Sequence, residues 1–409
     1  MTDSTYKLAL DHDLEKYFPE LAAFQSTEEM KASAVYREIK DEVEKVLTTV
    51  VQENFALPPP RPSATPPQAG GEFTGSADKV KALAWNIERG NRFDGIVEAL
   101  KTHPELKDKD LLLLTELDYG MARSGNRFVA RELAQALQLN YAFVTCYIAL
   151  QKGSGVESEV EGENTKAIHG LSMFSRYPMK NVHSIGLPNS IDKMRGKEKR
   201  LGTLRALIAD IQHPAGEFRA VTLHLDAHSS RAHRQLQMKI LLDHLATLPN
   251  LPTVIGGDWN TTTYNAHRAY RAILGYARGV FLIGVKKMIN NHFPHPDRFF
   301  ERGLFNELEK RDYDYKSLNV IGGGTLHYDR DNLAYNTNLG DWVPQWCFAW
   351  IYWALEKNGG KCSLKLDWFA GKDIKPAPGT GPKVIGKLRD TEAPLSDHDA
   401  IVLDFVPGN

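Results

Sequence analysis

Short apolar runs separated by turn signals dominate the chain from Val80 onward. Such runs, bounded by glycine, proline, asparagine or aspartate, are typical of β-strands. The predicted strands cover Lys81–Asn86, Leu111–Thr115, Tyr141–Ala149, Leu171–Phe174, Leu204–Ile211, Arg219–Leu225, Leu251–Ile255 and Ala400–Phe405. Apolar residues at helical spacing intervene and predict helices over Arg92–Lys101, Arg127–Leu137 and Arg231–Leu248. We therefore expect an α/β protein in which sheets pack together and helices lie outside them.

Two regions depart from this pattern. Leu8–Phe55 is predicted to be helical, because Val43, Val46, Leu47 and Val50 recur at helical spacing between charged residues. Residues 57–77 are rich in Pro, Gly, Ala and Ser and predict an extended linker. We thus expect a helical extension over residues 1–56, a linker over 57–77 and a main domain over 78–409, with 264–360 as a cap-like helical insertion. The extension either docks on the main domain, which is the commoner outcome, or mediates self-association.

Composition narrows the class of protein. Hydrophobic residues make up 42% and charged residues 25% of the 409 residues, which is ordinary for a globular chain. A formal net charge of −1 counts against a non-specific nucleic-acid binder. Cys146, Cys347 and Cys362 have no metal-binding spacing and no even number for disulfides, so we expect reduced thiols. Without a signal peptide or an apolar run long enough to span a bilayer, we expect a cytoplasmic protein.

Polar side chains close several of the predicted strands. The most informative segment is Val254–Thr261, in which an apolar run stops on Gly256, Gly257 and an Asp-x-Asn pair. The glycines let the backbone turn and a ligand approach, and residues two apart on extended backbone point to the same side. Taken singly, each polar residue is explained as well by a turn or a solvated strand end. Their repetition favours one shared site for phosphate or a hard metal ion. The residues are Asn86, Glu116, His224, Asp258, Asn260, Asp397 and His398.

In this order, these residues resemble the motifs of the endonuclease/exonuclease/phosphatase (DNase I-like) superfamily, whose members cleave phosphoester bonds with a divalent cation. Gly170–Pro178 resembles the family's strand-and-turn signature, and Lys365-Leu-Asp367-Trp368 resembles its late strand, whose aspartate orients the terminal histidine. The resemblance runs from about Val80 to Val406, apart from the insertion. It implies a four-layer α/β/β/α sandwich, with two packed mixed sheets flanked by helices, and makes the main domain catalytic.

The resemblance also implies roles for these residues. Glu116 would be the main metal ligand, and Asn86 and Asp397 would complete or support the site. The ion expected is Mg²⁺, with Mn²⁺ or Ca²⁺ as alternatives. Asp258, oriented by Asn260, would position and deprotonate the attacking water. His224 and His398, when protonated, would donate hydrogen bonds to phosphate oxygens, and Asp367 would hold His398. Whether Asp258 or the Asp367–His398 pair is the base stays open. Arg176 and His169 are candidates for contacts with substrate.

The insertion bears on the choice of substrate. Gly279–Ile289 is apolar with adjacent lysines, and Trp342–Trp353 contains four tryptophans. Such segments either pack against each other, form a wall over the site, or lie on a lipid surface as a peripheral contact. We expect a phosphodiesterase that acts on a small or lipid-like phosphoester and has no transmembrane segment. The alternatives are a metal-dependent nuclease and, from a different class, a non-catalytic binding module of the same fold.

Overall fold

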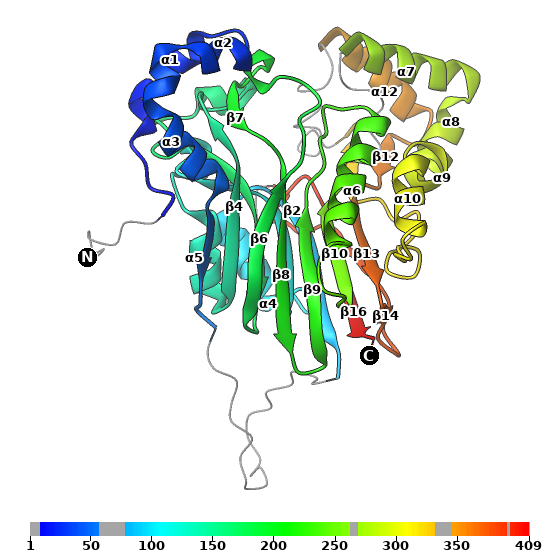
Figure 1. The fold of residues 1–409 in the computed structure, drawn as a ribbon. Helices are drawn as coiled ribbons and strands as arrows, with labels where there is room; N and C mark the ends of the chain where they lie inside the picture. Colours follow the sequence, from blue (N-terminus) through cyan, green and yellow to red (C-terminus); the bar gives the residue numbers. More distant parts are fainter. Residues whose placement is uncertain (1–8, 57–77, 262–268, 332–344, 391–392, 409) are drawn as a thin grey trace, which may run out of the picture.

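Two β-sheets pack face to face and helices cover their outer faces in the computed structural model of this chain (Figure 1). The structure describes residues 9–56, 78–261, 269–331, 345–390 and 393–408. The first sheet contains nine strands. Its main path is β1 (Val50–Glu53), β4 (Asn140–Ala149), β5 (Ile168–Ser175), β3 (Leu111–Tyr119), β2 (Val80–Arg89), β16 (Ala400–Pro407) and β14 (Ile374–Pro376), with β7 (Arg200–Gly202) beside β4 and β15 (Lys383–Ile385) beside β16.

The second sheet contains five strands and completes the expected pair of mixed sheets. Its order is β13 (Asp367–Lys372), β10 (Thr253–Asp258), β9 (Gly216–Leu223), β8 (Arg205–His213) and β6 (Met179–Gly186). In each sheet one pair of central strands is parallel, β2 with β3 and β9 with β10, while their other neighbours are antiparallel. The four-layer α/β/β/α fold predicted from the sequence is thereby confirmed.

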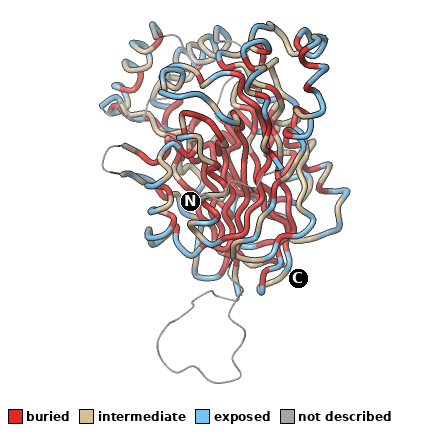
Figure 2. Tube along the Cα trace, turned by 90° about the vertical axis from the view of Figure 1, so that its left-hand side faces the viewer, coloured by how far each residue is buried: buried red, intermediate tan, exposed pale blue. Residues whose placement is uncertain are grey.

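The side chains of β2 show how the layers are held together. Ala82 and Ala84 belong to the core between the two sheets, whereas Leu83, Trp85 and Ile87 belong to the core beneath α4 (Phe93–Thr102) and α5 (Val129–Leu137). This alternation follows from the two-residue period of a strand. On the opposite side, α6 (Arg231–Leu245) and α10 (Arg302–Glu309) cover the second sheet. Figure 2 shows the buried residues concentrated along the strands.

The N-terminal extension is part of the same core. Leu10, Leu14 and Leu21 are fully buried in the cluster that also contains α5 and β4. The extension comprises the short 3-10 helix Leu14–Tyr17, then α1 (Phe18–Ala23), α2 (Thr27–Ala32) and α3 (Ala34–Thr48). The prediction that the helix continues to Phe55 is wrong, because residues 50–53 form β1 and pair antiparallel with β4 at the sheet edge. The branched side chains of Val50 and Val51 suit such a strand. The predicted linker over 57–77 lies outside the described residues.

The insertion is not a single cap. Its α10 packs on α6 in the outer helical layer, and Leu304, Phe305 and Leu308 enter the main core. The remaining elements surround a small separate cluster around Met288, Phe293 and Leu355. They are α7 (Ala269–Leu282), α8 (Val285–Lys287), the π-helix Met288–His292, α9 (Pro296–Phe299), the 3-10 turn Gln345–Cys347, α12 (Phe348–Glu356) and the antiparallel pair of β11 (Leu326–Asp329) and β12 (Lys361–Leu364).

The cysteines and the lengths of the helices bear on two expectations from composition. Cys146, Cys347 and Cys362 are all buried and free. Within the part of the chain that the structure describes, every helix is too short or too polar to cross a membrane.

Candidate active site

Strands of both sheets bring the predicted polar residues to one place. Asn86 lies on β2 and Glu116 on the adjacent parallel strand β3. His224 follows β9, and Asp258 ends the adjacent parallel strand β10. Parallel neighbouring strands end at the same edge of their sheet. The first sheet therefore brings Asn86 and Glu116 together at one edge, and the second sheet brings His224 and Asp258 together at one edge. Asp367, which begins β13, is the register partner of Asp258, and His398 precedes β16.

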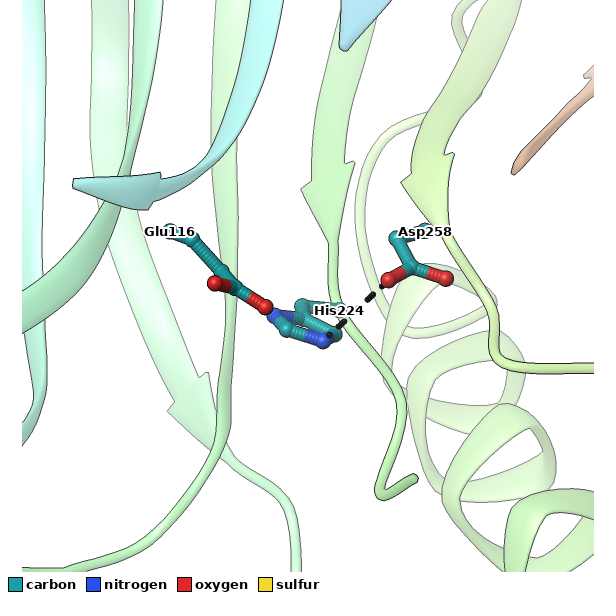
Figure 3. Close-up of side chains that lie close together, drawn as sticks. All are labelled: Glu116, His224 and Asp258. Carbon is teal, nitrogen blue, oxygen red and sulfur yellow. Dashed lines mark ion pairs between the residues drawn. The ribbon is translucent and has the colours of Figure 1, made fainter. Parts of the chain in front are cut away.

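One oxygen of Asp258 lies at the centre of this group. Its Oδ2 accepts hydrogen bonds at 3.2 Å from Asn86 Nδ2 and at 3.2 Å from Asn260 Nδ2. The same oxygen lies 3.5 Å from His224 Nε2 and 3.9 Å from His398 Nε2. Glu116 reaches the group from the other sheet, and His224 lies between Glu116 and Asp258 in Figure 3. Asp258 therefore joins the residues of the two sheets.

Local backbone geometry turns these side chains toward each other. Glu116 has φ +57° and sits where the pairing of β3 with β5 shifts register between Thr115 and Leu117, which marks a bulge. Such a bulge re-aims a side chain out of the regular ladder. Asn260 also has a left-handed φ, +51°, and its side chain donates to the carbonyl of Leu225 at 3.1 Å. This bond ties the segment after β10 to the segment that carries His224.

Gly257 allows β10 to approach β9 closely. A Cβ at this position would lie 2.1 Å from the carbonyl oxygen of Leu223, and the φ of Gly257 is +139°. We expect Gly257→Ala to lower the free energy of unfolding by about 2–4 kcal/mol, because the alanine is strained and meets backbone that cannot rotate away. Chemical denaturation monitored by circular dichroism measures this loss.

Gly381→Ala is the matched control, since a Cβ there meets open space and no positive φ is involved. It should change the free energy of unfolding by less than about 0.5 kcal/mol. Equal stability of the two variants would contradict the close approach inferred at Gly257.

Glu116 is held in its ionised form by a charged network that the sequence did not indicate. Burial alone raises the pKa of Glu116, but the Arg89 guanidinium, followed by His224 and His169, outweighs it and holds this pKa far below its ordinary value. Arg89 in turn pairs with Glu157 at 2.8 Å, and Glu157 accepts from Arg123 at 3.0 Å. Spacing along the chain carries no sign of this network, because Arg89 ends β2 while Arg123 and Glu157 lie on two separate 3-10 turns.

His398 and Asp258 have pKa values displaced by their shared environment. Burial lowers the pKa of His398, but the carboxylates of Asp367, Asp258 and Asp397 together raise it well above its ordinary value. Its Nδ1 lies 2.7 Å from Asp367 Oδ2, as the predicted orienting role requires. Burial raises the pKa of Asp258 to about 6, although His398 opposes this shift. Near neutral pH the site thus holds an ionised Asp258 beside a cationic His398.

Asn86 is oriented as a hydrogen-bond donor. Its Nδ2 donates to Glu116 Oε1 at 3.0 Å as well as to Asp258, while its Oδ1 accepts from the backbone N–H of Glu88 at 3.0 Å. These three partners together determine which way the amide points. The amide nitrogen of Asn86 therefore faces the two carboxylates, and its role in completing or supporting the metal site stays a prediction.

Glu88 is a site residue that the sequence reasoning missed. Its Oε2 accepts from the backbone N–H of Asp397 at 3.1 Å. Burial, and then the charge of Asp397, raises the pKa of Glu88 to about 8, and Glu116 adds to the effect. Glu88, Asp397 and Glu116 therefore form an acidic group. The available signal was position, because Glu88 lies two residues after Asn86, as Asn260 does after Asp258.

The two candidate substrate contacts lie in different places. His169 pairs with Asp118 across β5 and β3, with Nδ1 at 2.8 Å from Oδ1, and is close enough to Glu116 to influence its pKa. The prediction that Arg176 faces the site is corrected. Its Nε lies 3.6 Å from Asp110 Oδ1, and Asp110 is the residue before the start of β3. At about 3.3 Å per residue, Asp110 is about 20 Å along the strand from Glu116. Only His169 borders the site.

Comparison with known proteins identifies the family. Residues 83–353 match the Endonuclease/Exonuclease/phosphatase family, which is more than half of the chain. No curated protein matches. A solved endonuclease/exonuclease/phosphatase from Beutenbergia cavernae is 15% identical with a TM-score of 0.47, and the match covers 81% of this chain and 72% of that one. The counterpart from Bacteroides vulgatus is 14% identical with a TM-score of 0.45, covering 80% and 98%.

The catalytic domain of human Nocturnin, solved with bound sulfate, is 16% identical with a TM-score of 0.42, covering 80% of this chain and 93% of that one. These three structures are too distant to indicate a substrate. The assignment rests on the sequence match over residues 83–353. The chain belongs to the endonuclease/exonuclease/phosphatase family of phosphoester hydrolases.

Proposed function

We propose that this protein is a divalent-metal-dependent phosphodiesterase that acts on a small or lipid-like phosphoester. The observation that carries the proposal is the convergence on Asp258 Oδ2 of Asn86, Asn260, His224 and His398 beside an acidic group. Phosphoester hydrolysis needs a base for water, donors for the phosphate oxygens and positive charge for the leaving group. The first two are supplied by the chain itself.

The acidic group fits a hard divalent cation. Glu116 remains ionised, and Glu88 accepts from the backbone N–H of Asp397, so that burial and then the charge of Asp397 raise the pKa of Glu88 to about 8. A bound cation would relieve this repulsion, and carboxylate oxygens are the donors that Mg²⁺ prefers. Glu116 would be the main ligand of the ion, with Glu88 and Asp397 supporting it from nearby, and the ion would be Mg²⁺ first, with Mn²⁺ or Ca²⁺ as alternatives. When bound, it supplies Lewis-acid stabilisation of phosphate and leaving-group oxygens.

The other residues would divide the work on water and phosphate. Asp258, with a pKa of about 6, accepts the proton of the attacking water at neutral pH, and the backbone N–H of Asn260 holds its Oδ1 at 2.9 Å. His398, kept cationic by the carboxylates around it, donates from Nε2 to a phosphate oxygen while Asp367 holds Nδ1. His224 offers a second donor. This division makes Asp258 the base and His398 the donor.

The charges beside the site support a small or lipid-like ester over a polynucleotide. Arg89 pairs with Glu157, Arg123 with Asp118, Lys193 with Asp226 and Arg200 with Glu198. Cations neutralised in this way do not form the positively charged track that a nucleic-acid backbone requires. A metal-dependent nuclease is the second candidate, because the same machinery cleaves any accessible phosphodiester.

A substrate panel tests the proposal. We expect the purified chain with Mg²⁺ to hydrolyse an aryl phosphodiester or a phospholipid, and EDTA to abolish turnover. The panel also includes inositol phosphates and plasmid DNA. Turnover of DNA alone would favour the nuclease. Inertness toward every substrate, together with a melting temperature unaffected by Mg²⁺, Mn²⁺ or Ca²⁺, would favour a non-catalytic binding module.

Glu116→Gln should weaken metal dependence most. Replacing the carboxylate removes a charged oxygen ligand, so the Mg²⁺ concentration for half-maximal activity should rise about 10–100-fold. Titration of activity against Mg²⁺ measures this shift. Glu53→Gln is the matched control, because Glu53 pairs with Arg131 at the sheet edge, 2.9 Å away and outside the site. Identical Mg²⁺ curves for the two variants would remove Glu116 from the proposed ligands.

A further inference from the structure

The exposed hydrophobic residues of the molecule gather on the insertion. Of ten large hydrophobic side chains exposed among the described residues, seven lie on α7, α12 and the turn before α12. Phe281 is 81% exposed, Leu282 73% and Trp346 65%. Exposed hydrophobic residues that gather in one region of a protein surface mark a binding site more often than scattered ones do. The seven are Tyr270, Leu274, Phe281, Leu282, Trp346, Trp350 and Trp353.

The inner face of α12 already serves the fold. Ile351, Tyr352 and Leu355 of α12 pack with Ile283 and Met288, which follow α7, in the small cluster of the insertion. Trp346, Trp350 and Trp353 recur every three or four residues, which places them on the opposite stripe of the helical segment. The outer stripe of α12 is thus additional to what the insertion needs for its own packing. We call this stripe, the tryptophan of the turn before it and the exposed hydrophobic residues of α7 the apolar face.

Positive charge accompanies this face. Residues 269–296 contain neither aspartate nor glutamate, and their exposed cations include Arg278, Lys286 and Lys287. Lys286 and Lys287 are exposed on α8, directly after α7. Directly after α12, Lys357 Nζ lies 4.0 Å from the centre of the Trp353 ring. Tryptophan with lysine beside exposed aliphatic and phenyl groups is the composition that suits the interface of an anionic bilayer.

The apolar face lies at the catalytic end of the molecule. α7 and α12 stand beyond the ends of the strands in Figure 1, at the top of the view. α12 packs on β12, and β12 pairs with β11. Leu326 of β11 forms a bridge with His398, and the carbonyl of Thr325 accepts from the backbone N–H of Asp399 at 2.7 Å. A surface that held α12 would therefore lie close to the active site.

We propose that the apolar face docks this protein on the surface of an anionic phospholipid bilayer, so that the site acts on phosphoesters presented there. We choose a lipid surface over a second copy of this chain because of charge. Two apolar faces in contact would bring the positive charges of Lys286 and Lys287 of both chains together, and these charges repel each other. The purpose of docking rests on the proposed hydrolase function, whereas the docking itself rests on the apolar face alone.

Vesicle co-sedimentation of the full chain tests the proposal. We expect binding to vesicles of phosphatidylcholine with a minority of phosphatidylserine, and much weaker binding to phosphatidylcholine alone. Phe281→Ser combined with Trp350→Ser should weaken binding about tenfold or more. Lys286→Gln with Lys287→Gln should weaken it about 25-fold on anionic vesicles, at about fivefold for each lysine. Leu236→Ser on α6, which removes a side chain that is 45% exposed elsewhere, should leave binding unchanged.

Two further measurements separate this proposal from its rivals. Equal vesicle binding by the wild-type chain and both double variants would overturn it. So would a dimer in gel filtration that Phe281→Ser with Trp350→Ser converts to a monomer, because the face would then meet a second copy. Hydrolysis of soluble bis-p-nitrophenyl phosphate should be the same in both double variants. Vesicle binding without any hydrolysis would refute the proposed function and leave the docking in place.

Discussion

Asp258→Asn should reduce kcat for an aryl phosphodiester by about two to four orders of magnitude. Asp258 is almost fully buried, and the same oxygen that accepts from Asn86 and Asn260 faces both histidines of the site. An asparagine amide fills the same space but cannot take a proton from water. Steady-state kinetics at saturating Mg²⁺ should show the loss in kcat, with a much smaller change in KM.

A matched buried aspartate separates chemistry from stability. Asp210 is buried on β8 and pairs with Arg219 Nε at 2.8 Å, on neighbouring antiparallel strands. Asp210→Asn should lower the melting temperature, because it leaves the Arg219 charge with a weaker partner, and should leave kcat unchanged. If Asp258→Asn kept wild-type kcat while remaining folded, Asp258 would not be the base, and the Asp367–His398 pair would take that role.

Periodicity was sufficient to predict the layers but not the edges of the sheets. The central strands are long apolar runs, so β2, β3, β4 and β10 were predicted close to their observed positions. β1 follows α3 after a single residue, and Val50 also continues the helical spacing of Val43 and Val46. Helix and strand patterns overlap there, and only the pairing partner β4 decides between them. A partner distant in the sequence is invisible to local periodicity.

The prediction of the site residues succeeds and fails for the same reasons. Residues at the ends of predicted strands, such as Glu116 and Asp258, were found because the end of an apolar strand can be predicted from the sequence. Arg176 also follows a strand, β5, yet β5 is antiparallel to β3, so its end lies at the opposite edge from Glu116. Arg89 lowers the pKa of Glu116, and Arg89 is held by Glu157, which also pairs with Arg123 and lies in a loop region. Strand direction and loop conformation are tertiary properties, and they account for both kinds of error.

Asp367→Asn should shift the pH dependence of turnover as well as its rate. In the wild type, turnover that needs ionised Asp258 rises with pH through about 6. Turnover that needs protonated His398 falls only at alkaline pH, because Asp367, Asp258 and Asp397 outweigh burial and raise the pKa of His398. The profile of kcat/KM should therefore be bell-shaped, with an acidic limb near 6 and a distant alkaline limb.

Removing the Asp367 charge acts on both limbs in the same direction. His398 loses the carboxylate that raises its pKa most, so the alkaline limb should move down by about 1–2 pH units. Asp258 loses a neighbouring negative charge that raises its own pKa, so the acidic limb should move down too. The asparagine also carries no full negative charge to accept the hydrogen bond from His398, so it holds the ring less firmly. We therefore expect kcat at the optimum to fall about 10²–10³-fold.

Asp399→Asn is the control for this pH shift. Asp399 is the next residue after His398, but its carboxylate lies 2.7 Å from His327 Nε2, so its removal should leave the alkaline limb where it is. A merely structural role for Asp367 would lower kcat at every pH without moving either limb. An unmoved alkaline limb in Asp367→Asn would therefore show that this limb reports a group other than His398, and would leave Asp258 as the group that sets the acidic limb.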